Sequence, residues 1–127
     1  MVGIVIVSHS RTLADGVTEL ARAMGVGKAT VEPAGGDADG GMGTSADLVE
    51  EAVERADDGD GVVLLADIGS AVLTAKLVLE DAPGNVVLAD APLVEGAVAA
   101  ASIAATGADL DTVKTAAESA RHHGKLS

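Results

Sequence analysis

The sequence predicts an α/β fold, in which an open, mainly parallel sheet of about four strands is covered by helices. Short apolar runs rich in valine and isoleucine alternate with longer stretches whose apolar residues recur at helical spacing. The 127 residues suit one compact domain with a substantial core. We therefore expect a single domain over residues 1–121, followed by a C-terminal tail over residues 122–127.

Four segments have the composition of buried strands. The run at residues 61–66 is apolar throughout, which is typical of a strand covered on both faces. Residues 2–7 form a second such run, and residues 30–32 and 86–89 predict two shorter strands. A turn is expected at residues 83–85, where proline, glycine and asparagine occur together.

A helix should follow each of these strands, and a fifth helix should close the domain. Leu13, Val17 and Leu20 mark one face of the first helix, which is expected to end at Gly25. The other four are expected to begin after residues 45, 70, 91 and 109 and to end near residues 56, 80, 107 and 121.

The chain is strongly acidic, with 20 Asp and Glu residues against 8 Lys and Arg residues and a formal charge of −12. Such a charge repels nucleic acids and anionic lipids, so neither a nucleic acid nor a membrane is expected as a partner. The acidic residues are spread along a chain that is 48% hydrophobic. This combination indicates a folded protein with a heavily hydrated surface, as expected from a halophilic source.

Residue types that are missing exclude further classes of protein. Without cysteine there is no disulfide, thiolate metal site or cysteine nucleophile, and without Phe, Tyr or Trp there is no aromatic stacking on bases or sugars. The first apolar run lacks a basic flank and is broken at residues 8–10, which argues against a signal peptide and favours the cytoplasm. His122 and His123 have no liganding pattern, so we expect no metal and no cofactor.

Reactive side chains follow the predicted strands at the points where these strands end. The C-terminal ends of parallel strands lie at one edge of a sheet, and ligands bind there. His9 follows the first strand and Asp67 the third. A neutral histidine has one ring nitrogen free to attack phosphorus, and a carboxylate on the other nitrogen would fix the tautomer. Taken singly, His9 could be a polar strand end and Asp67 a helix cap.

Two predicted helix starts could hold a phosphoryl group. Backbone N–H groups of Gly41, Gly43 and Thr44 would face the phosphate oxygens at one start, and Gly69 and Ser70 would do so at the other. A glycine loop that ends in a capping threonine is also a common structural device, and residues 69–70 could simply cap the third helix. Arg11 is expected to face a partner protein rather than to clamp the phosphate.

Other nucleotide and phosphate motifs do not fit. Lys28 follows a glycine as in a P-loop, but the position where the motif requires its first glycine is occupied by Arg22. A dinucleotide fingerprint and a serine hydrolase elbow are both missing. A phospho-aspartate receiver would place its acceptor at Asp67, yet serine and histidine stand where it needs acidic residues after the first strand. His9 is therefore the better acceptor.

Four motifs, in order, resemble those of a known family: VIVSHS at residues 5–10, GT at 43–44, DIGSA at 67–71 and APLVEG at 91–96. They are similar to the phosphotransferase subunit of phosphoenolpyruvate-dependent dihydroxyacetone kinase, a relative of the mannose-type enzyme IIA domains. The resemblance covers residues 1–114. The first and last motifs favour the dihydroxyacetone branch over the sugar-transporter branch.

The resemblance implies a phosphoryl carrier of glycerol metabolism. His9 would be phosphorylated on Nε2 beside Asp67 by the histidine phosphocarrier protein, acting in trans. It would then rephosphorylate ADP on the kinase's nucleotide-binding subunit, while dihydroxyacetone is bound by a third subunit. Relatives imply a homodimer. The alternatives are a mannose-type enzyme IIA that serves a sugar transporter and a regulatory module that senses phosphorylation.

Overall fold

The computed structural model describes residues 1–82 and 84–126. Its sheet has four strands in the order β2-β1-β3-β4, and every neighbouring pair is parallel. The α/β prediction is therefore confirmed. The strands are β1 (Gly3–Ser8), β2 (Thr30–Gly35), β3 (Val62–Ala66) and β4 (Val86–Leu88). The helices are α1 (Arg11–Met24), α2 (Ala46–Ala56), α3 (Gly69–Asp81), α4 (Leu93–Ala104), α5 (Leu110–Ser119) and the 3₁₀ helix η1 (Ala120–His122).

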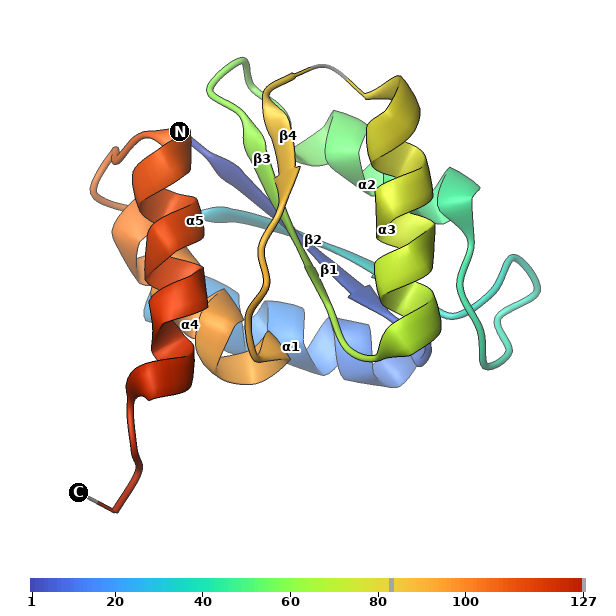
Figure 1. Ribbon diagram of the computed structural model, residues 1–127, viewed down its shortest axis with the longest axis horizontal. Coiled ribbons are helices and arrows are strands. Elements are labelled where there is room, and N and C mark those ends of the chain that lie inside the picture. Colours follow the sequence, from blue (N-terminus) through green and yellow to red (C-terminus); the bar gives the residue numbers. More distant parts are fainter. Residues whose placement is uncertain (83, 127) are drawn as a thin grey trace.

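Helices cover both faces of the sheet. Figure 1 shows α2 and α3 on one side and α1, α4 and α5 on the other. The side chains of β1 alternate between the two layers, because successive residues of a strand point to opposite faces. Ile4 and Ile6 join the core beneath α1, α4 and α5, whereas Val5 and Val7 join the core beneath α2 and α3. The sheet is thus buried on both sides.

The element bounds differ from the sequence expectations in several elements, including the last helix, where α5 ends at Ser119 and η1 continues to His122. Strand β2 extends to Gly35 and pairs Pro33 with Ile6, although a proline cannot donate to a strand ladder. The sheet tolerates it because β2 is an edge strand. Strand β4 is one residue shorter than expected, and α4 ends at Ala104. Two residues of these predictions lie outside the described residues: residue 83 of the turn expected at residues 83–85 and residue 127 at the end of the predicted tail.

A close backbone approach fixes the start of α1 against the end of β2. A Cβ atom on Gly35 would lie 2.6 Å from both the Cβ of Ala14 and the carbonyl oxygen of Ser10. Only glycine leaves room for this contact. It positions the turn that joins β1 to α1, which is the turn that carries His9.

The order of the strands produces a crevice at their C-terminal edge. Strands β1 and β3 are neighbours, yet their helices α1 and α3 pack on opposite faces of the sheet. Ligand sites of open α/β sheets form at such switch points. None of the helices within the described part of the chain is long and apolar enough to cross a bilayer.

Candidate functional site

His9 and Asp67 meet at the switch point. Val7 pairs with Ala66 in the sheet, so the residues that follow each strand emerge side by side. The Nδ1 atom of His9 lies 2.9 Å from Oδ1 of Asp67. Their side chains are 23% and 12% exposed, so both are largely buried but still reach solvent.

The carboxylate of Asp67 accepts four hydrogen bonds. Oδ2 accepts from the hydroxyl of Ser8 at 2.8 Å and from the backbone N–H of His9 at 3.1 Å. Oδ1 accepts from Nδ1 of His9 and from the N–H of Ile68 at 2.7 Å. Ser8 is fully buried. The carboxylate is therefore fixed in both position and orientation.

These donors keep Asp67 ionised. Burial acts to raise the pKa of the carboxyl group, but the hydrogen bonds from His9, Ile68 and Ser8 outweigh burial and hold the pKa below its ordinary value. An ionised carboxylate carries no proton, so the hydrogen between the two side chains belongs to Nδ1 of His9. The lone pair of the neutral ring consequently lies on Nε2.

The first turn of α3 faces this free nitrogen. The hydroxyl of Ser70 is in hydrogen-bond contact with Nε2, and when the ring is neutral with its proton on Nδ1 the hydroxyl is the donor. In the described chain the N–H groups of Gly69 and Ser70 donate to no acceptor, as is usual at a helix start. A phosphoryl group on Nε2 would displace the hydroxyl and meet these donors at the positive end of the helix dipole.

The glycine loop supports His9 from the other side. The N–H of Gly43 donates to the carbonyl oxygen of His9 at 3.0 Å, and the N–H of Gly41 donates to Oδ1 of Asp37 at 2.8 Å. The hydroxyl of Thr44 bonds to that of Thr74 on α3 at 2.7 Å. In this structure, then, the donors that we expected to hold phosphate at Gly41 and Gly43 are engaged within the protein.

Arg11 is the first residue of α1 and is exposed. Its guanidinium lies beside the glycine loop, 3.8 Å from the position that a Cβ on Gly40 would take. It forms no ion pair with the carboxylates of residues 1–82 and 84–126. A cation at a helix N-terminus opposes the helix dipole, which indicates that Arg11 is not placed there to stabilise the helix.

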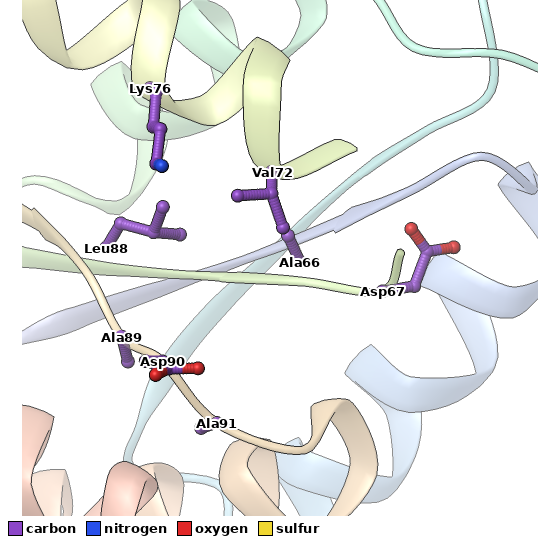
Figure 2. Close-up of a pocket in the computed structure, with 8 residues that line it drawn as sticks. All are labelled: Ala66, Asp67, Val72, Lys76, Leu88, Ala89, Asp90 and Ala91. Atoms are coloured by element: carbon purple, nitrogen blue, oxygen red, sulfur yellow. The ribbon is translucent and has the colours of Figure 1, made fainter. Parts of the chain in front are cut away.

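A cavity of about 500 Å³ adjoins the pair on the side of β4. Figure 2 shows Lys76 and Val72 reaching down from α3 with Leu88 beneath Lys76, the segment after β4 on the opposite wall, and Asp67 at one end. Asp90 in that segment is tied to the C-terminal region by Arg121, whose Nη2 lies 3.0 Å from Oδ1. Within the described chain, no group of three or more side chains could ligate a metal ion.

Three residues at this site were not singled out from the sequence. Ser8 orients Asp67, Asp37 folds the glycine loop, and Thr74 ties that loop to α3. Ser8 offered a signal, because a serine at the end of an otherwise apolar strand has to satisfy its hydroxyl in a buried place. Asp37 and Thr74 gave no such signal, because polar residues at these positions in the sequence look like any other exposed polar residues.

The parallel sheet and the histidine–carboxylate pair at its edge define an enzyme IIA-like α/β domain. A family model described as "PTS system fructose IIA component" matches residues 3–114, and the chain belongs to that family. A crystal structure of EF1359, described as a protein of unknown function, superimposes with a TM-score of 0.82 at 33% identity and covers 92% of each chain.

Three curated relatives that resemble this chain carry the name DhaM. The phosphoryl donor subunit DhaM of the phosphoenolpyruvate-dependent dihydroxyacetone kinase of Escherichia coli is 44% identical over 120 residues, which is 89% of this chain but only 25% of that protein. A DhaM of Listeria innocua is 38% identical over 100 residues, 79% of each chain. The DhaM of Lactococcus lactis, a phosphotransferase subunit, is 35% identical and covers 88% of this chain and 89% of its own.

Proposed function

We propose that this protein is a phosphoryl donor subunit of a dihydroxyacetone kinase and that it carries the phosphoryl group on Nε2 of His9. The observation that carries the proposal is the placement of the two ring nitrogens. Nδ1 is held by an ionised carboxylate at 2.9 Å, and Nε2 faces the first turn of α3. Two relatives named DhaM, which this chain matches over most of their length, support the kinase assignment.

The chemistry needs no proton transfer at the nucleophile. The lone pair of Nε2 attacks phosphorus, the bond between phosphorus and the donor breaks, and the donor's leaving atom keeps the electron pair. The phosphorylated ring retains the Nδ1 proton and becomes cationic, and Asp67 stabilises that charge. In the second transfer an oxygen of the acceptor attacks the same phosphorus, and the electron pair of the broken bond returns to Nε2.

A carrier has to release its phosphoryl group as readily as it accepts it. The proposed phosphate ligands are neutral: the hydroxyl of Ser70 and the N–H groups of Gly69 and Ser70, with the first turn of α2 after Thr44 as a second source. Arg11 stands at the rim, where it would meet the partner. Neutral donors stabilise the phosphoryl oxygens without the tight binding that a clamp of cations would give.

The donor and acceptor in this proposal are the histidine phosphocarrier protein and ADP on the nucleotide-binding kinase subunit, with dihydroxyacetone on a third subunit. The relatives' descriptions support the kinase, and the resemblance of the four motifs supports the two transfer steps. The proposal also includes one domain over residues 1–121, a cytoplasmic location, a homodimer and a halophilic source, the last supported by the charge of −12.

A second function has one observation in its favour. The family model carries the description of a fructose IIA component, which belongs to a sugar phosphotransferase system. In that case the same phosphohistidine would pass its group to a transporter component instead of to kinase-bound ADP. The proposed histidine chemistry is common to both functions, and only the acceptor separates them.

The test begins with phosphoenolpyruvate, enzyme I and the phosphocarrier, followed by intact-mass measurement of this protein. Wild type should gain one acid-labile phosphoryl group, and His9→Ala should gain none. His122→Ala is the matched control, because that histidine is exposed on η1 and should not affect labelling. Label that persists in His9→Ala contradicts the acceptor. Transfer from labelled protein to ADP-loaded kinase subunits, but not to a sugar-specific IIB component, separates the two functions.

A further inference from the structure

The cavity beside Asp67 has the size and the lining of a small-molecule site. Its volume of about 500 Å³ falls within the range of about 300–1,000 Å³ in which proteins hold small ligands. Most of its lining is apolar and consists of Ala66, Val72, Leu88, Ala89 and Ala91. Ligand cavities combine such walls with a few charged groups that fix the orientation of the ligand. The charged side chains of this cavity therefore determine which class of ligand it accepts.

Two of the three charged side chains that line the cavity already have partners within the protein. A carboxylate offers about four lone pairs to hydrogen-bond donors, and that of Asp67 accepts four hydrogen bonds. Asp90 is paired with Arg121, whose Nη2 lies 3.0 Å from Oδ1. Neither carboxylate is left for a cationic group of a ligand.

Lys76 is the third charged residue of the cavity, and its ammonium group has no partner. It lies on α3, and no carboxylate of residues 1–82 or 84–126 forms an ion pair with it. Figure 2 shows this ammonium group directed toward Leu88, at the end of the cavity away from Asp67. The cavity thus presents one unpaired positive charge next to an apolar wall.

An unpaired cation is uncommon in this acidic chain. The chain has eight Lys and Arg residues, and five of them form ion pairs: Arg22, Arg55, Lys114, Arg121 and Lys125. Of the three unpaired side chains, only that of Lys76 lines this cavity. An anionic group that enters the cavity would therefore meet a cation that no side chain of the described residues neutralises.

We propose that this cavity is a binding site for a small monocarboxylate with an apolar body. The carboxylate of the ligand pairs with the ammonium group of Lys76, and its hydrocarbon part lies against Val72 and Leu88. The apolar contacts remove hydrocarbon surface from water, and the ion pair fixes which end of the ligand faces α3. The inference does not depend on the proposed function, because the site does not include His9.

The lining of the cavity disfavours other classes of ligand. An ammonium ligand would be repelled by Lys76, and an alcohol would leave that charge unpaired. A phosphate ester carries close to two negative charges and needs several donors, whereas the cavity offers one ammonium group. The free N–H groups of Gly69 and Ser70, which could hold a phosphate, do not line it.

The test compares three compounds that share a five-carbon chain and differ in the head group: pentanoate, pentanol and pentylammonium. Each is titrated into ¹⁵N-labelled protein while the amide resonances are followed, in about 0.5 M NaCl to screen the charge of −12. Pentanoate should shift the amides of the cavity residues and bind about tenfold more tightly than pentanol, because only the acid pairs with Lys76. Pentylammonium should bind no more tightly than pentanol. Acetate should bind about tenfold more weakly than pentanoate, because it lacks three methylene groups.

Lys76→Met removes the ammonium group and keeps an unbranched apolar side chain. In this variant pentanoate should bind no more tightly than pentanol. Lys28→Met is the matched control, because Lys28 is also exposed and without an ion pair but lies between α1 and β2, away from the cavity. It should bind all four compounds as wild type does. Since both lysines are exposed, both variants should fold.

Several results would overturn the inference. Equal affinity for pentanoate and pentylammonium, or an unchanged preference for pentanoate in Lys76→Met, would show that Lys76 does not select the ligand. Acetate binding as tightly as pentanoate would contradict the role of the apolar wall. Amide shifts confined to residues outside the cavity, or no saturation by about 0.1 M pentanoate, would show that the cavity is not a binding site for this class.

Discussion

Replacing Asp67 by Asn tests the assignment of the two ring nitrogens. The amide offers one acceptor oxygen where the carboxylate has two, and its NH₂ group donates. Ser8 and the N–H of His9 lie deeper than the N–H of Ile68, which water can reach. The amide oxygen should therefore take the Oδ2 position, because a buried donor without an acceptor is costly. The NH₂ group then faces Nδ1 and donates to it, which moves the ring proton to Nε2.

The expected loss follows from the bond that is removed. A hydrogen bond to a charged group contributes about 1.5–3 kcal/mol, and under the proposed function the charged form is the phosphorylated ring. At about 1.4 kcal/mol per factor of ten, Asp67→Asn should slow phosphoryl transfer about 10- to 100-fold. The protein should still fold, since the side chain keeps its shape.

Two measurements check this prediction. Rapid-quench kinetics with phosphorylated donor gives the transfer rate, and ¹⁵N NMR of the His9 ring reports which nitrogen carries the proton. Asp90→Asn is the control, because Asp90 lines the same cavity and its side chain is 90% exposed. Wild-type transfer in Asp67→Asn, with the proton still on Nδ1, would refute the reasoning.

Three further predictions concern stability. Folding lowers the pKa of the Asp67 carboxyl group below its ordinary value of 3.8. The ionised carboxylate therefore stabilises the folded protein fully above pH 3.8, and this stabilisation is lost as the pH falls through the folded pKa. Acid unfolding of Asp67→Asn should consequently show a shallower pH dependence than that of wild type. Gly35→Ala should lower the free energy of unfolding in urea by about 1–3 kcal/mol, since the new Cβ would lie 2.6 Å from that of Ala14. Gly16→Ala, in the interior of α1 with open space around it, should instead stabilise the protein by about 0.5–1 kcal/mol. Ser8→Ala should lower the free energy of unfolding by about 1–3 kcal/mol, and a wild-type melting temperature would contradict the role of its buried hydroxyl.

The fold was largely predictable because its signals are local. Apolar runs mark the central strands, and apolar residues that recur at helical spacing mark the helices that cover them. The error at β2 has a physical origin: Pro33 stops a strand by its own chemistry, and only its place at the edge of the sheet permits pairing. Edge position is a property of the assembled sheet, which the residues around Pro33 do not encode.

The proximity of His9 and Asp67 was predictable for a related reason. Parallel strands end at one edge, so residues that follow two neighbouring strands meet there whatever the loops do. The glycine loop behaves differently. Whether the N–H groups of Gly41 and Gly43 face a ligand or the protein depends on the path of the loop, and that path is set by Asp37 and by the carbonyl oxygen of His9.

Main-chain bonds join the segment of His9 to its neighbours on both flanks. The N–H of Gly36 donates to the carbonyl oxygen of Ser8 at 3.0 Å, and the N–H of Asp67 donates to that of Val7 at 3.1 Å. His9 and Asp67 consequently belong to a single rigid unit, so the proposed phosphoryl transfer to and from His9 would require no hinge. The phosphorylated and unphosphorylated forms of such a carrier would have almost the same backbone structure. Partner proteins would therefore distinguish the two forms by the phosphoryl group itself.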